Sequence, residues 1–132
     1  MPPTIKPRAE ARPIGRCNIG AAEVERRRRM AIALTAAAIA LAVALAALAV
    51  PHLARLVLWP VAAAAGVTWL QVTNRFCVAF GAAGLENFGP LGAERRVADD
   101  QAAADRRRAQ LLILEGAVAG LLVTLAFVAV PV

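Results

Sequence analysis

The chain has 132 residues, of which 60% are hydrophobic, and its mean hydropathy of +0.62 exceeds that of an ordinary water-soluble domain. A net charge of +6 would suit nucleic acid, but the cations lie where apolar segments end, not along one helix face or among stacking aromatics. Composition and charge therefore exclude a soluble globular domain, predict an integral membrane protein, and lead us to expect no nucleic-acid partner.

The N-terminal segment carries four prolines among basic residues, and we predict that residues 1–19 form a disordered, basic cytosolic tail. A helix is expected to begin near Gly20. Glu23 and Glu25 then fall in its first turns, where the positive end of a helix favours acidic side chains.

Four consecutive arginines, Arg26, Arg27, Arg28 and Arg29, lead into the uncharged residues 30–50. A helix over residues 30–50 would be ~31 Å long, which matches the ~30 Å hydrocarbon core of a bilayer. A cleaved signal peptide is the other interpretation, because Ala47-Leu48-Ala49 fits a cleavage site. The long apolar stretch and the long segment before it favour an uncleaved span.

A second span is predicted over residues 56–73, after a short turn. Trp59 and Trp69 lie near its two ends, which is typical of the aromatic belt at a membrane surface. Apolar sequence continues to residue 85, and glycines and Pro90 then interrupt it. We therefore assign residues 20–92 to a transmembrane hairpin with an extension along the inner face.

The last unit, residues 93–132, is predicted to contain a charged cytosolic helix over 93–110 and a third span over 111–130. Arg106, Arg107 and Arg108 would anchor their junction at the membrane surface. Eight basic residues precede the first span, six lie between the second and third, and the outer turn holds only Arg55. The positive-inside rule thus predicts a cytosolic N-terminus and an external C-terminus. The predicted fold is all-α.

Both cysteines, Cys17 and Cys77, fall at the cytosolic membrane face in this topology. Neighbouring arginines favour the thiolate, the form that attacks persulfides and disulfides, so a redox or sulfur-handling site is one interpretation. Two inert, small apolar residues are the other, and the sequence leaves open whether the thiols meet. His52 lies at the opposite side and no zinc pattern occurs, so we expect neither metal nor cofactor.

Glu115 is the only acidic residue inside a predicted span, where a carboxylate is costly and usually functional. If the span begins at Leu111, Glu115 needs Gln71 or Arg75 from the neighbouring helix. If the span begins at Gly116, which is the interpretation we favour from the sequence, Glu115 is an interfacial anchor. A subunit of a transporter or channel that depends on Glu115 follows from the first alternative.

Gly116 and Gly120 have the GxxxG spacing, which lets two helix backbones approach closely. The spacing predicts helix packing or homodimerisation. It also arises easily in a span made of small residues.

The sequence Asn18-Ile19-Gly20, followed by Glu25-Arg26, Arg29 and a hairpin closing on Phe76-Cys77, resembles the YgaP-like transmembrane domain family. The matching positions are Asn18, Gly20, Arg26, Arg29 and Cys77, within residues 17–88. The resemblance implies a small bacterial inner-membrane hairpin that dimerises and, in relatives fused to a rhodanese domain, is associated with persulfide chemistry. Val78 stands where the family has a proline, and no rhodanese domain is attached.

No phosphate-binding loop, nucleophile elbow or carboxylate pair occurs in the sequence, so we expect the chain not to be an enzyme. The leading hypothesis is a structural or interaction module that self-associates or docks a membrane-protein partner. A thiol site and a transport-related subunit are the alternatives. The bilayer and a second copy are the expected partners, and no small-molecule substrate is indicated.

Overall fold

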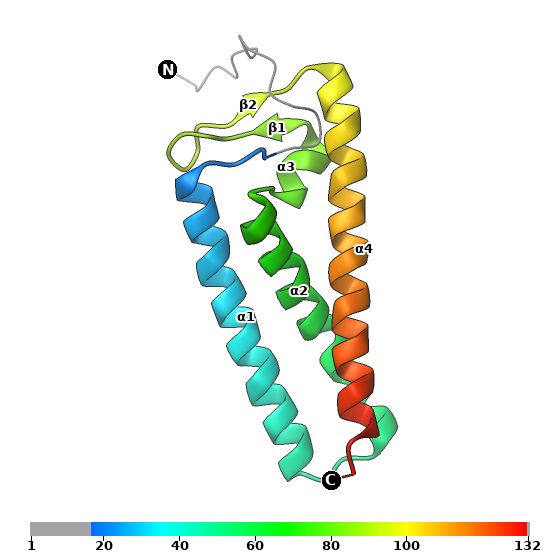
Figure 1. Cartoon of the computed structure of the whole chain (residues 1–132). Coiled ribbons are helices and arrows are strands. Elements are labelled where there is room, and N and C mark those ends of the chain that lie inside the picture. The colour runs from blue at the N-terminus through cyan, green and yellow to red at the C-terminus, as the bar shows by residue number, and fades with distance from the viewer. Residues whose placement is uncertain (1–16, 132) are drawn as a thin grey trace.

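The computed structural model describes residues 17–131. Three long helices dominate it (Figure 1) and two strands form a short ribbon at one end. The remaining predicted tail, residues 1–16, lies outside the described residues. The elements, in chain order, are α1 (Ala21–Ala47), η1 (His52–Val57), α2 (Leu58–Asn74), α3 (Val78–Ala83), β1 (Leu85–Glu86), β2 (Arg95–Arg96) and α4 (Asp99–Ala129).

Three helical segments are long and apolar enough to cross a membrane: Ala21–Ala47, His52–Asn74 and Asp99–Ala129. The predicted number and order of apolar helices are confirmed. The middle segment combines the 3-10 helix η1 with α2, and Pro60 falls in the first turn of α2, where its missing N–H is tolerated.

The third long helix differs from the prediction. The charged segment and the third apolar segment form one continuous helix, α4, rather than a cytosolic helix over 93–110 followed by a separate span. No glycine or proline interrupts the chain between Asp99 and Glu115, so nothing ends the helix there. Arg95 and Arg96 instead form β2, which pairs antiparallel with β1, so the fold is not entirely helical.

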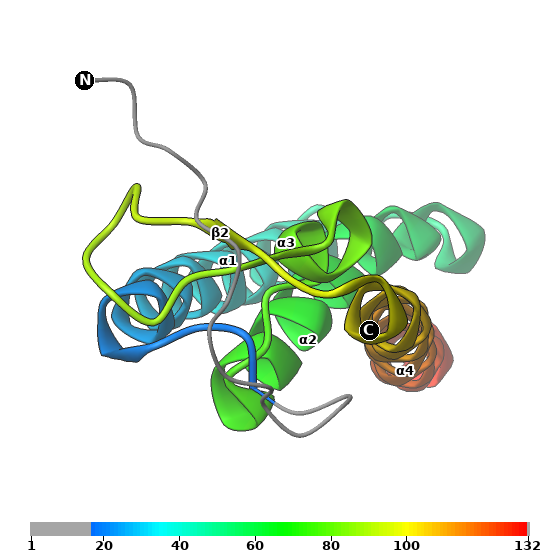
Figure 2. The ribbon, with the colours of Figure 1, turned by 90° about the horizontal axis from the view of Figure 1, so that it is seen from above.

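Helix α2 lies between α1 and α4 (Figures 1 and 2) and packs against both. Its contact with α4 is very close, because a Cβ added to Gly120 would lie 2.5 Å from the backbone nitrogen of Ala63. A Cβ added to Gly116 would lie 2.6 Å from the backbone nitrogen of Val67. Only glycine at these two positions permits the observed separation of the helices.

Contacts between the long helices show which residues of α1, α2 and α4 lie at the same level along the bundle. Arg108 donates a hydrogen bond to the side-chain oxygen of Asn74 at the end of α2, while Val67 lies opposite Gly116. The indole Nε1 of Trp69 donates to Thr35 Oγ1 of α1 at 2.9 Å. Helix α2 is therefore hydrogen-bonded to both α1 and α4. We call the end of the bundle where α1 and α4 begin the basic end.

Residues 18 and 19, assigned from the sequence to the disordered tail, are instead buried at the basic end. The segment 17–20, which we call the strap, crosses between the end of α2 and the β1–β2 ribbon. The amides of Asn18 and Ile19 donate to the Arg75 carbonyl, the Gly20 amide donates to the Asn87 carbonyl, and the Asn87 amide donates to the Asn18 carbonyl. The first helix is thus attached to later parts of the chain before it begins.

Candidate functional site

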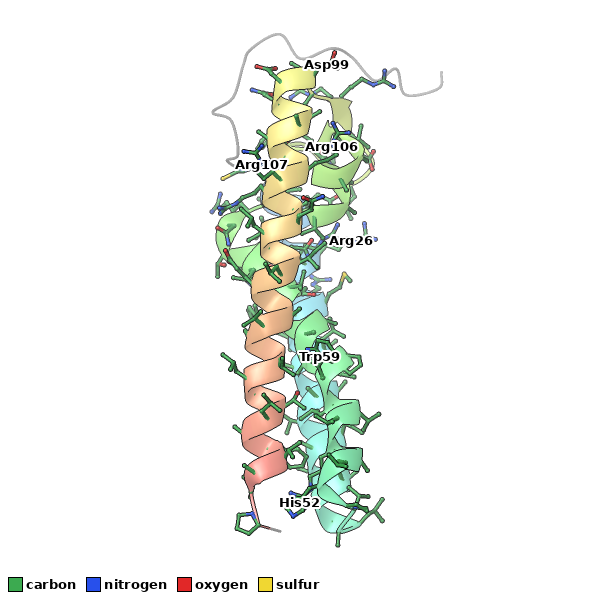
Figure 3. The ribbon with its side chains drawn as sticks, turned by 90° about the vertical axis from the view of Figure 1, so that its right-hand side faces the viewer. Arg26, His52, Trp59, Asp99, Arg106 and Arg107 are labelled. Atoms are coloured by element: carbon green, nitrogen blue, oxygen red, sulfur yellow. The ribbon has the colours of Figure 1, made fainter. Side chains whose placement is uncertain are left out.

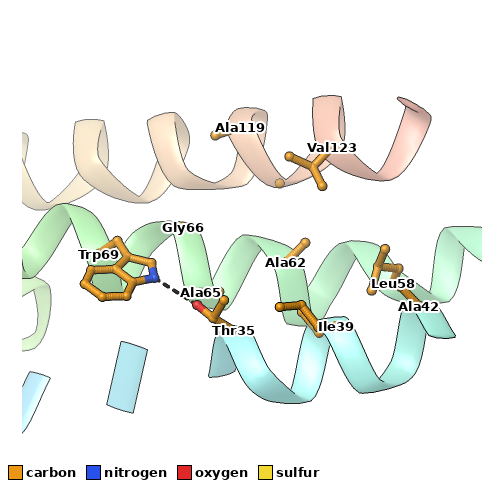
Figure 4. Close-up of a pocket in the computed structure, with 12 residues that line it drawn as sticks. Thr35, Ile39, Ala42, Leu58, Ala62, Ala65, Gly66, Trp69, Ala119 and Val123 are labelled. Atoms are coloured by element: carbon orange, nitrogen blue, oxygen red, sulfur yellow. Dashed lines mark hydrogen bonds between the residues drawn. The ribbon is translucent and has the colours of Figure 1, made fainter. Parts of the chain in front are cut away.

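An apolar groove runs along the side of the bundle, between α1 and α4 and with α2 as its floor (Figure 4). Its volume is about 360 Å³. The lining is made mostly of small side chains: Thr35, Ala38, Ile39, Ala42, Leu58, Ala62, Ala65, Gly66, Trp69, Ala119, Gly120 and Val123. Small residues on all three walls leave room for an apolar partner to approach the backbones.

The groove has one polar end. Trp69 lies at the end nearer the basic end and Leu58 toward the other (Figure 4), with the Trp69 to Thr35 hydrogen bond joining the walls formed by α2 and α1. Thr35 in turn donates to the Ala31 carbonyl at 2.8 Å. Both indoles contact neighbouring helices, since Trp59 Nε1 donates to the Ala117 carbonyl of α4 at 3.0 Å.

Glu115 is exposed on α4, on the side that borders the groove. It precedes Ala119 by four residues and Val123 by eight, so the three residues share one row along the helix. The structure does not bring Glu115 to Gln71. The Gln71 side chain is buried, and its oxygen accepts a hydrogen bond from the Val78 amide, where it supports the start of α3.

Gly116 and Gly120 face α2 within the same chain. Both are buried, and their close approach to Val67 and Ala63 uses the GxxxG face inside the bundle. That face is therefore not open to a second copy. The sequence spacing predicted a close helix contact, but it carried no information on whether the partner helix belonged to the same chain.

The two cysteines occupy different environments. Cys77 is buried, and its Sγ accepts a hydrogen bond from Arg27 Nη2 at 2.9 Å, whereas Cys17 is half-buried in the strap. Arg27 also pairs with the buried carboxylate of Glu23 at 3.7 Å. Within residues 17–131 no three histidine, cysteine or acidic residues are placed to hold a metal ion.

Three of the five positions that carry the YgaP-like resemblance meet at the basic end. The Asn18 side chain donates to the Cys77 carbonyl at 3.1 Å and accepts from the Cys77 amide at 2.7 Å. Gly20 is required there, because a Cβ would lie 2.6 Å from the Phe88 carbonyl oxygen. Arg26 and Arg29 are exposed and do not join this contact.

Exposed arginines surround the basic end, where Figure 3 labels Arg26, Arg106 and Arg107 at the end opposite His52. Arg28 and Arg29 pair with Glu25 at 3.1 and 3.4 Å, so part of their charge is balanced on α1 itself. Arg108 differs from its neighbours, because it is half-buried and bonded to α2.

The opposite end of the bundle holds a contact that the sequence analysis missed. Arg55 was treated as a turn residue, yet it is 1% exposed and donates to the Phe127 and Val130 carbonyls at 3.3 and 2.7 Å. His52 Nδ1 donates to the Val128 carbonyl at 2.6 Å. A cation at the C-terminus of α4 interacts favourably with the negative end of the helix dipole, and it hydrogen-bonds carbonyls that have no partner within the helix.

Comparisons with family models, with curated proteins and with solved structures gave no match. The YgaP-like resemblance therefore stays a prediction that rests on the residues named above.

Proposed function

We propose that the chain is a docking module in the bacterial inner membrane, with its N-terminus in the cytosol, that binds a transmembrane helix of a partner in the groove between α1 and α4. The groove is the observation that carries this proposal. Its walls are small and apolar over a helical stretch of each of α1, α2 and α4. Close packing of small residues is the main source of helix association in lipid, where no hydrophobic driving force remains.

The packing of α1 supports the proposal. In the most apolar stretch of α1 only 6% of the residues are buried, whereas 22% are buried in the corresponding stretch of each of the other two apolar segments. α1 therefore retains most of its surface for lipid or for another helix. The arginines at the basic end support the orientation, because cations beside apolar segments favour the cytosolic side.

The two alternatives have less support. Cys77 is 1% exposed and held by Asn18 and Arg27, which is unfavourable for thiol exchange with another molecule. A transport path would need polar residues across the bundle, whereas the groove lining is almost wholly apolar.

A photo-crosslinking experiment in native membranes tests the docking proposal. A benzophenone side chain is placed at Ala119, inside the groove, or at Ala40, which is exposed on α1 outside the lining. We expect a protein adduct at Ala119 that peptide mass spectrometry assigns to one apolar helix. Adducts with lipid alone at Ala119 would contradict the proposal.

The matched substitutions Ala38→Leu and Ala40→Leu provide the control. Ala38 lines the groove and Ala40 does not, yet both are alanines on α1. Filling the groove at Ala38 is expected to remove the Ala119 adduct, and the same change at Ala40 is expected to leave it. An adduct that survives Ala38→Leu would place the partner elsewhere.

A further inference from the structure

We propose that Glu115 recognises a basic side chain on the partner helix that occupies the groove. This inference rests on the docking function proposed above and adds the chemistry of the partner.

Glu115 lies well inside the apolar part of the bundle. It follows Arg108, the last arginine before the apolar stretch, by seven residues, which is roughly 10 Å along a helix. The neighbouring Gly116 packs against Val67, two residues from Trp69, and Trp69 is bonded to Thr35 of α1. Thr35 itself lies six residues beyond Arg29. The depth of Glu115 counted from Arg108 along α4 therefore agrees with the depth of the facing residue counted from Arg29 along α1.

The register argues against a span that begins only at Gly116. Such a boundary would place the first apolar turns of α1, residues 30–35, outside the hydrocarbon. That is unfavourable, because the apolar side chains of Met30 and Ile32 are exposed on the surface of the bundle. A common boundary near Arg29 and Arg108 instead gives α1 and α4 apolar lengths close to the ~30 Å of the bilayer. Glu115 then faces the hydrocarbon rather than the headgroups.

The chain supplies no partner for this carboxyl. Within residues 17–131 no side chain forms a hydrogen bond or ion pair with Glu115, and its exposed neighbours on α4 are Leu111, Leu114 and Val118. A carboxylate in hydrocarbon is expensive unless it is paired, and a cation from another molecule would supply the missing partner.

A second copy does not offer the needed charge. In a symmetric membrane dimer, both copies place each residue at the same depth. The arginines of the described chain lie at or beyond Arg29 and Arg108 at the basic end, or at Arg55, which contacts the C-terminal end of α4. Two Glu115 carboxylates facing each other would repel. The charge at this depth therefore comes from a different chain.

A lipid ammonium group is also poorly placed. Lipid headgroups lie at the level of the exposed arginines, and the Glu115 backbone lies roughly 10 Å deeper. A lysine or arginine fixed on a transmembrane helix can be held at that depth by the packing of its own helix.

The position of Glu115 links this pairing to the groove. Glu115, Ala119 and Val123 form one row of α4, and the last two line the groove. A helix packed on Ala119 and Val123 therefore passes Glu115 where it leaves the groove toward the basic end. Recognition would combine apolar packing with one ion pair near the cytosolic side.

A defined peptide tests the inference. The full chain is reconstituted in phosphatidylcholine vesicles with a fluorescent single-span Leu/Ala peptide that carries one lysine about seven residues inside its cytosolic boundary. A matched peptide has leucine at that position. We expect the wild type to bind the lysine peptide roughly 3-fold to 30-fold more tightly than the leucine peptide, by energy transfer, in line with polar contacts between transmembrane helices. Glu115→Leu is expected to abolish the preference.

The outcomes separate the two proposals. If the leucine peptide binds, Ala38→Leu displaces it and lysine adds nothing, the groove docks a helix and the inference about Glu115 is refuted. If neither peptide binds, both proposals fail. A parallel reconstitution adds phosphatidylethanolamine to the vesicles. If that lipid is retained by the wild type and lost in Glu115→Leu, with no lysine preference, the carboxyl binds a lipid headgroup and the inference is overturned.

Discussion

Substituting alanine for Gly120 is expected to loosen the bundle, although alanine is the better helix former. The added methyl group would lie 2.5 Å from Ala63 N and 2.8 Å from the Ala62 carbonyl carbon, so α2 and α4 must separate. Overpacking of this kind typically costs about 1–3 kcal/mol. The gain in helix propensity of about 1 kcal/mol offsets part of it. The methyl group meets backbone atoms, which cannot move aside as a flexible side chain can, so the cost lies in the upper part of that range and we expect a net loss of roughly 1–2 kcal/mol in the free energy of unfolding.

Gly66→Ala is the matched control for this prediction. It adds the same methyl group on the same interface, but the nearest atom, the Gly116 carbonyl oxygen, is 3.0 Å away. Its effect should therefore be smaller than that of Gly120→Ala.

Reversible unfolding in mixed detergent micelles measures both variants. Trp59 reports on the α2–α4 interface, because its indole donates to the Ala117 carbonyl. A Gly120→Ala protein as stable as the wild type, or less affected than Gly66→Ala, would refute the reasoning. So would a change in self-association with no change in the unfolding of the single chain.

Three further substitutions probe the ends of the bundle and the α1–α2 contact. Asn18→Ala removes two hydrogen bonds to the Cys77 backbone and should lower the free energy of unfolding by about 1–3 kcal/mol. Maleimide labelling of Cys77 should become faster. Unchanged labelling would contradict the idea that the strap covers Cys77. Arg55→Leu should speed hydrogen exchange in the last turn of α4, whereas equal exchange would show that its carbonyls need no cation. Trp69→Phe should weaken the α1–α2 contact by about 0.6 kcal/mol in unfolding experiments, and an equally stable variant would contradict a role for the bond to Thr35.

The three long helices could be predicted because their signal is local. Each apolar stretch is long enough to span a bilayer, and the arginine runs at Arg26–Arg29 and Arg106–Arg108 mark where two of them begin. The error in α4 has a local cause as well. A change from charged to apolar residues was taken as a helix boundary, but both kinds of residue belong to one continuous helix.

The contacts between elements could not be predicted, because they depend on long-range register. Nothing near Asn18 in the sequence indicates that its side chain bonds the backbone of Cys77, and only the YgaP-like resemblance grouped the two residues. Arg55 was judged from its place in a turn, whereas its burial depends on the end of α4. The groove could not be predicted from the sequence either, since the alanines that line it cannot be distinguished in the sequence from alanines elsewhere on the helices.

The strap has a consequence for the order in which the molecule assembles during synthesis. Asn18 and Gly20 are made first, but their hydrogen-bond partners include Asn87, which follows nearly seventy residues later. The hairpin of α1 and α2 can therefore insert while the segment before it is still unattached. The contacts of the strap with Asn87 form only after β1 has been made. By then both of the first two apolar helices have been synthesised.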